Sequence, residues 1–170
     1  MTVVWEGTID DSSAMEEFGR RVGGFLRAGD LLVLTGPLGA GKTTMTRGLG
    51  LGVGVRGQVA SPTFVLARTH PALHAGGPPL VHVDAYRLGS AAELDDLDID
   101  YDRSIVVAEW GAGLLDGVTE SWLEVTIERP TGAGSAALEA ETEAEAEIDE
   151  PRHVVVEGHG PRWDGVALPL

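Results

Sequence analysis

The residues best suited to chemistry in this sequence lie in "GPLGAGKTT", which runs from Gly36 to Thr44. The stretch matches the pattern G-x-x-x-x-G-K-[ST] in full and includes Lys42, the only lysine of the 170 residues. Glycines in such a loop let the backbone curl, so that successive N–H groups point inward and bind phosphate oxygens. The Lys42 ammonium would reach the β- and γ-phosphates of a nucleotide, and the Thr43 hydroxyl would bind Mg²⁺. A chance match in a glycine-rich turn is disfavoured by the apolar run before the loop and the helical pattern after it.

Two acidic residues at the ends of apolar runs are candidates for holding Mg²⁺ and orienting water. Asp84 ends "LVHVD" and Glu109 ends "IVVAE", so each carboxylate follows a stretch that should be buried, where an unpaired charge is costly. In a parallel sheet both would lie at the carboxyl edge, beside the phosphate loop. The alternative is that each acid simply emerges into solvent where its strand ends. With Lys42 they form the predicted catalytic group.

Other side chains leave alternatives open. Arg87 either stabilises transferring charge or pairs with a surface acid, and Trp110 either packs in the core or covers the nucleotide. Ser61 and Thr63, in "SPTF", either form an ordinary turn or place hydroxyls near the γ-phosphate. His82 lies within an apolar run, so we expect a hydrogen-bonded core histidine.

The elements that must position these residues alternate along the chain. Apolar runs predict strands at 31–35, 63–68, 80–88 and 104–110, and alternating patterns predict antiparallel strands at 122–128 and 153–158. Helices are expected at 13–27, where Ser13 and Glu16 form a capping box, directly after the phosphate loop, and from Ser90. This order predicts an α/β protein: a three-layer P-loop NTPase fold with a mostly parallel central sheet and C-terminal antiparallel strands.

Composition narrows the functional classes. The length fits a single domain over residues 1–170, in which the glutamate-rich segment 131–150 is expected to be a flexible, solvated hairpin insertion. Twelve basic against 27 acidic residues disfavour binding of DNA or other nucleic acid by this chain alone. Cysteine is absent, which excludes disulfides and thiolate sites. No apolar run approaches the roughly 18 residues that span a bilayer, and no secretory signal is visible, so a cytoplasmic protein is expected.

Four motifs in order, "GPLGAGKTT", "SPTF", "HVDAYRL" and "VVAEWG", make the sequence resemble the TsaE (formerly YjeE) family over about residues 8 to 128. The resemblance implies a P-loop ATPase that binds ATP and Mg²⁺ and supports threonylcarbamoylation of adenosine 37 in tRNA. It also implies association with the TsaD and TsaB proteins, so that tRNA is contacted only indirectly through their complex.

The resemblance also implies roles for individual residues. Thr43 and Glu109 would hold Mg²⁺, and Asp84 would orient or activate the attacking water. Thr8 would lie near the adenine, and Trp110 matches the tryptophan that follows the metal-binding acid. The residues implied in nucleotide binding are Gly36, Gly39, Ala40, Gly41, Lys42, Thr43, Thr44, Thr8, Ser61, Thr63 and Trp110. Two departures from the family pattern are Pro37, where an acid is common, and the long acidic insertion, to which the family's hairpin contacts cannot be transferred.

Two other functional classes share the phosphate loop. A small P-loop metabolite kinase would need an arginine-bearing lid, whereas the candidate lid region 93–102 is acidic. A non-catalytic nucleotide-sensing adaptor would bind ATP without turnover and would not need both carboxylates. A GTPase is disfavoured further, because its N-K-x-D motif needs a second lysine.

Overall fold

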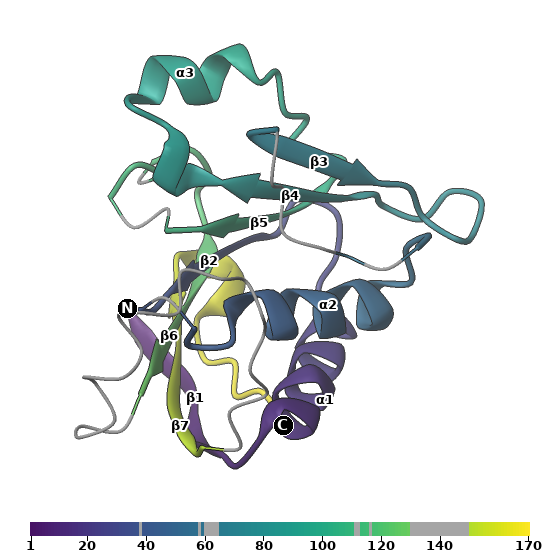
Figure 1. Ribbon diagram of the computed structural model, residues 1–170. Coiled ribbons are helices and arrows are strands. Elements are labelled where there is room, and N and C mark those ends of the chain that lie inside the picture. The colour runs from purple at the N-terminus through teal and green to yellow at the C-terminus, as the bar shows by residue number, and fades with distance from the viewer. Residues whose placement is uncertain (38, 58, 60–64, 111–112, 116, 130–149) are drawn as a thin grey trace.

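The computed structural model describes all residues except 38, 58, 60–64, 111–112, 116 and 130–149 (Figure 1). Its strands are β1 (Thr2–Ile9), β2 (Leu31–Thr35), β3 (Ala67–His70), β4 (Leu80–Asp84), β5 (Ile105–Glu109), β6 (Trp122–Glu128) and β7 (Arg152–His159). Its helices are α1 (Ser12–Gly23), α2 (Lys42–Val53) and α3 (Ala91–Asp96), with 3₁₀ turns η1 (Ala85–Arg87) and η3 (Pro161–Trp163). No helix among these described residues is both long and apolar enough to cross a membrane.

The strands form one seven-stranded sheet in the order β1-β7-β6-β2-β5-β4-β3. The four central strands β6, β2, β5 and β4 run parallel, while β3, β7 and β1 add antiparallel strands at the two edges. The predicted fold class is therefore confirmed. The predicted strand at 122–128 does pair antiparallel with β7, but it also pairs parallel with β2, and this second pairing joins the C-terminal strands to the central sheet.

Helices α1 and α2 pack together on one face of the sheet (Figure 1). Their contact is close because glycines line it: a β-carbon at Gly19 would lie 2.2 Å from the Met45 carbonyl oxygen, and one at Gly48 would lie 2.0 Å from that of Glu16. Glycine weakens a helix by about 1 kcal/mol relative to alanine. In this protein the absence of side chains at these positions lets the two helix backbones come into contact. This contact explains the glycine-rich sequence of α2.

The opposite face of the sheet carries a second apolar cluster. Leu94 of α3 and the following Leu97 and Ile99 pack against it, with the acidic residues between them exposed. The predicted helix start is confirmed, since the Ser90 hydroxyl accepts a hydrogen bond from the Glu93 amide. The segment 93–102 thus has an apolar side that covers the sheet and an acidic side in water, as expected.

The predicted helix at 13–27 and the predicted strand at 63–68 need correction. The first helix begins at Ser12 and is capped by Asp11, whose carboxylate accepts a hydrogen bond from the Ala14 amide at 2.8 Å, so Ser13 and Glu16 do not cap it. It ends at Gly23, which leaves Phe25 outside the helix and 41% exposed. The strand predicted at 63–68 begins only at Ala67, and residues 63–64 lie outside the described residues. Strand β1 was not predicted at all.

Two predicted strands are shorter than expected. The run at 80–88 ends as a strand at Asp84 and continues as η1, and the run at 104–110 forms a strand only over Ile105–Glu109. Both strands therefore end at the acidic residue that sequence reasoning singled out.

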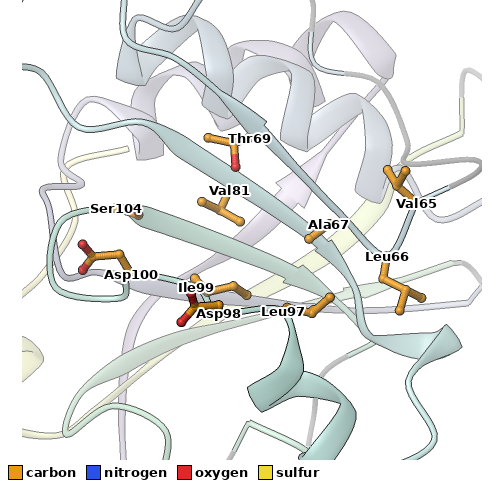
Figure 2. Close-up of a pocket in the computed structure, with 10 residues that line it drawn as sticks. All are labelled: Val65, Leu66, Ala67, Thr69, Val81, Leu97, Asp98, Ile99, Asp100 and Ser104. Atoms are coloured by element: carbon orange, nitrogen blue, oxygen red, sulfur yellow. The ribbon is translucent and has the colours of Figure 1, made fainter.

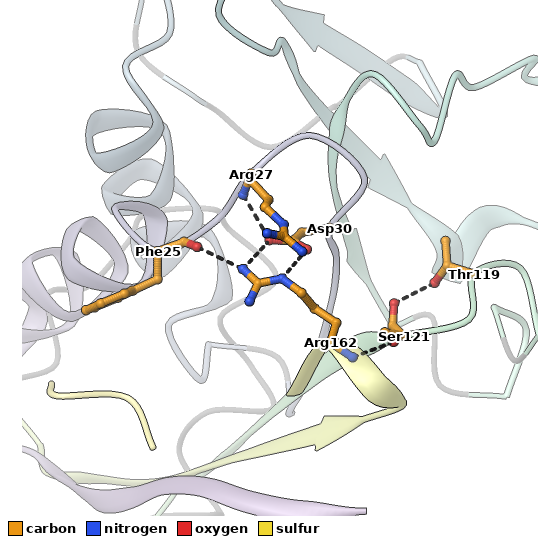
Figure 3. Close-up of polar contacts among 6 residues, drawn as sticks. All are labelled: Phe25, Arg27, Asp30, Thr119, Ser121 and Arg162. Carbon is orange, nitrogen blue, oxygen red and sulfur yellow. Dashed lines mark hydrogen bonds and ion pairs between the residues drawn. The ribbon is translucent and has the colours of Figure 1, made fainter. Parts of the chain in front are cut away.

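A buried ion pair fixes the start of β2 (Figure 3). Asp30 is 5% exposed and accepts hydrogen bonds from the Arg162 guanidinium at 3.3 and 3.4 Å and from the Arg27 amide at 2.9 Å. Arg162 also donates to the Phe25 carbonyl, and its own amide donates to the Ser121 hydroxyl. The C-terminal turn η3 is thereby tied to the connection between α1 and β2.

Candidate phosphate-binding site

The loop between β2 and α2 has the backbone that its glycines predict. Gly39 and Gly41 have φ angles of +75° and +108°, in the left-handed region that other residues avoid. At Gly36 the limit is space, since a β-carbon there would lie 2.7 Å from the Ile127 carbonyl oxygen of β6. Thr43 and Thr44 are partly exposed in the first turn of α2, where helix amides are free to bind an anion.

Lys42 is buried, with 6% of its surface exposed. Its ammonium donates hydrogen bonds to the carbonyl oxygens of Gly36 at 2.8 Å and Pro37 at 2.9 Å, and it lies 3.9 Å from the ring centre of Trp110. Burial lowers the pKa of Lys42 to about 8, while the negative charges of Glu109 and Asp84 act in the opposite direction. The lysine is therefore a buried cation between the loop and the two carboxylates.

The two predicted carboxylates lie side by side at the carboxyl ends of neighbouring parallel strands. Asp84 pairs in register with Glu109, and Glu109 is 5% exposed. Burial raises the pKa of Asp84, and the like charge of Glu109 raises it further, whereas the Arg87 guanidinium, 3.4 Å from the Asp84 carboxylate, lowers it. Of the two alternatives for Arg87, the structure shows the ion pair, and its partner is a site residue.

Trp110 directly follows Glu109 and has a φ angle of +64°. This is a strained conformation for a bulky residue, with a cost of about 1–3 kcal/mol. The backbone is held there by a hydrogen bond from the Trp110 amide to the Leu34 carbonyl of β2 at 2.9 Å. The indole lies over the Lys42 ammonium and 5.8 Å from the ring of Tyr86. Trp110 is half-buried and belongs to neither apolar cluster of the described residues.

The remaining predicted residues of the nucleotide site are Thr8, Ser61 and Thr63. Thr8 is exposed on the edge strand β1, and its neighbour Ile9 points into the core on the α1 and α2 face, so Thr8 points to the opposite face. Ser61 and Thr63 lie outside the described residues. A pocket of about 560 Å³ lies between β3, β4 and residues 97–100, but none of the predicted site residues lines it (Figure 2).

Arg152 was not predicted from the sequence, although its side chain forms hydrogen bonds with the phosphate loop. This first residue of β7 is 6% exposed and donates hydrogen bonds to the carbonyl oxygens of Ala40 at 3.3 Å and Gly39 at 3.5 Å. Burial lowers its pKa, and the nearby guanidinium of Arg129 does the same. The only local signal was an arginine at the start of a strand that contains three consecutive valines, which does not reveal a contact 112 residues away in the chain.

The fold and this loop define the class: a mixed α/β protein with a glycine-rich loop of the phosphate-loop pattern after β2, and with acidic residues ending β5, which pairs with β2, and β4, the next strand of the sheet. Residues 9–136 match the family described as "Threonylcarbamoyl adenosine biosynthesis protein TsaE", and the chain belongs to this family.

Relatives of known name agree with that assignment. The chain is 53% identical over 152 residues to the tRNA threonylcarbamoyladenosine biosynthesis protein TsaE of Streptomyces coelicolor, which covers 88% of this chain and 93% of the relative. It is 35% identical over 108 residues to the TsaE of Bacillus subtilis, covering 62% of this chain and 65% of that protein. The crystal structure of Bacillus subtilis YdiB superposes with a TM-score of 0.64 at 23% identity, covering 94% of this chain and 88% of that one, which supports the fold.

Proposed function

We propose that this chain binds and hydrolyses ATP with Mg²⁺ and thereby supports threonylcarbamoyladenosine modification of tRNA at position 37, together with TsaD and TsaB in the cytoplasm. The observation that carries the proposal is the placement of Lys42, Asp84 and Glu109. The buried ammonium lies in the phosphate loop, and its pKa responds to the charges of both strand-end carboxylates. The names of the relatives support the pathway.

The residues present fit a nucleotide phosphate chain and Mg²⁺. Gly36, Gly39 and Gly41 keep β-carbons out of the loop, so that its amides are accessible to anionic oxygens. Glu109 is a carboxylate with only 5% of its surface exposed, and burying an unpaired carboxylate is costly unless a cation or a hydrogen-bond donor serves it. Thr43 supplies the hydroxyl, and hydroxyl and carboxylate oxygens are ligands that Mg²⁺ prefers. Bound Mg²⁺ would neutralise phosphate charge.

The chain's own residues then have distinct roles. Lys42 exchanges its hydrogen bonds with the Gly36 and Pro37 carbonyls for phosphate oxygens, and Thr43 and Glu109 hold the metal. Asp84 has a raised pKa and accepts a hydrogen bond from water, which it orients for attack. Trp110 covers the lysine and excludes bulk water from it.

The test is phosphate release from ATP by the purified protein, alone and with the cognate TsaB and TsaD proteins. Hydrolysis that rises on addition of the two partners is expected. Transfer of the labelled γ-phosphate to a small molecule with no free phosphate would instead identify a kinase. ATP binding without turnover in every combination would identify a nucleotide-sensing adaptor. Hydrolysis that ignores both partners, with no detectable complex, would contradict the proposed role in tRNA modification.

A further inference from the structure

His82 occupies an unusual position for a histidine. It lies in the middle of β4, two residues before Asp84, and is 0% exposed. Its burial in the core was predicted, but neither ring nitrogen has a hydrogen-bond partner at normal distance among the described residues. A buried polar atom without a partner costs about 1–3 kcal/mol. Histidine at this position therefore needs an explanation that packing alone does not supply.

A carboxylate oxygen of the site lies close to this ring. The Nε2 atom of His82 lies 3.6 Å from Oε1 of Glu109, and this Oε1 is itself buried and has no partner at hydrogen-bond distance among the described residues. The two atoms that lack partners thus face each other across neighbouring parallel strands. The gap exceeds an ideal N–H···O distance by about 0.6 Å, which a small rotation of the carboxylate would close.

Both side chains lie on the sheet face that carries α2 and the phosphate loop. Leu80 and Ile105, which alternate in step with His82 and Glu109, belong to the apolar cluster on this face. The backbone register pairs His82 with Val107 and Asp84 with Glu109. His82 therefore lies two residues before the acidic pair along β4, on the same face of the sheet. From there its ring reaches the inner oxygen of Glu109.

We infer that His82 is a positioning residue that donates a hydrogen bond from Nε2–H to Oε1 of Glu109 and so directs the other carboxylate oxygen toward the metal. The inference rests on the proposed function, because it assigns Glu109 to Mg²⁺. Carboxylates that bind metals are themselves held by hydrogen bonds, and removing such outer partners typically costs about 10- to 100-fold in metal affinity. His82 is the described side chain placed to do this for Glu109.

The test compares His82→Met, which fills the volume without a donor, with His82→Gln, which keeps an N–H at similar reach. ADP affinity is measured by calorimetry with Mg²⁺ and with EDTA. His82→Met should lose about 10- to 100-fold of the Mg²⁺-dependent affinity while ADP binding in EDTA stays at the parent level, and His82→Gln should recover most of it. His70→Met is the matched control: His70 is a histidine 6% exposed on β3, in the same apolar layer, and should leave the Mg²⁺ effect intact.

Three results would overturn the inference. One is a Mg²⁺ effect in His82→Met equal to that of the parent. Another is an equal loss of affinity with and without Mg²⁺, which would mean a structural role only. The third needs no variant and no nucleotide: long-range ¹H–¹⁵N spectra of the parent must show a proton on Nε2, and a neutral ring protonated only on Nδ1 excludes the donor role. If the parent itself fails to bind ADP, the proposed function fails while the spectrum still decides the His82 contact.

Discussion

Replacing Lys42 by methionine should make the nucleotide-free protein more stable at neutral pH, although it removes the central cation of the site. Methionine has a similar length and fills the same space without a charge. Burial lowers the pKa of Lys42 from 10.5 to about 8, and each pKa unit corresponds to about 1.4 kcal/mol. The buried ammonium therefore destabilises the fold by about 3 kcal/mol at pH 7. Methionine removes this cost.

The same replacement also removes favourable contacts. The carbonyl oxygens of Gly36 and Pro37 lose their donor, at a cost of about 0.5–1.5 kcal/mol each. The net gain for Lys42→Met at pH 7 should then be between about 0 and 2 kcal/mol, measured as the free energy of unfolding in urea. The cost of the strained Trp110 backbone is common to both proteins and cancels in the difference.

The dependence on pH tests the cause of this gain. Below pH 8 both the folded and the unfolded parent bind the lysine proton, and the cost of burying the charge is present in full. Between pH 8 and 10.5 the folded parent has released the proton and the unfolded chain has not, so the parent gains stability as pH rises. Lys42→Met should therefore be the more stable protein at pH 7 and the less stable one near pH 10.

A control in the same loop isolates the titration. Thr43→Ala removes a hydroxyl that does not titrate in this range, so its stability difference from the parent should stay constant from pH 7 to pH 10. A Lys42→Met variant that is less stable than the parent at pH 7, by an amount unchanged up to pH 10, would refute the description of Lys42 as a buried, destabilised cation.

Three further predictions concern the site and its support. Glu109→Gln should slow ATP hydrolysis by at least about 100-fold in a phosphate-release assay while equilibrium dialysis still detects ATP binding; turnover at the parent rate would contradict the role of this carboxylate. Gly48→Ala should lower the free energy of unfolding by about 2 kcal/mol or more, despite the better helix propensity of alanine. Gly24→Ala is the control and should change this free energy little, because the nearest atom to its β-carbon would lie at 3.4 Å, an ordinary contact distance. Arg162→Met should cost about 3 kcal/mol in urea unfolding at pH 7 because it leaves Asp30 buried without its ionic partner, and recovery of stability in the Asp30→Asn, Arg162→Met double variant would confirm the coupling.

Features encoded over a few consecutive residues could be predicted from the sequence. The phosphate loop is such a feature, since its spacing alone specifies a strand, a glycine-rich turn and a helix start. The acids Asp84 and Glu109 were found because each ends an apolar run, and parallel strands bring such ends to one edge. The first helix cap was misplaced because Asp11 and Ser13 both suit that position, and only the backbone geometry selects between them.

Features that depend on distant contacts could not be predicted in the same way. The sequence alone gives no reason for the glycines of α2, yet Gly48 is needed because the backbone of α1 contacts it. Strand β1 is an edge strand whose pairing partner, β7, begins more than a hundred residues later. The sequence around Arg152 does not indicate that this residue contacts the phosphate loop. In each case the missing information is the tertiary neighbour.

The unfavourable features of this chain are concentrated at one place, and that concentration is itself an argument about function. Lys42 is a cation buried against its preference, Asp84 is a carboxylate with a raised pKa, and Trp110 holds a strained backbone over the lysine. For Lys42, a single substitution that removes the buried charge should make the isolated fold more stable at pH 7. A chain optimised only for folding would not combine all three at the carboxyl edge of its sheet. A polyphosphate with its metal ion would offset these costs together, because it brings anionic oxygens to Lys42 and a cation to the carboxylates.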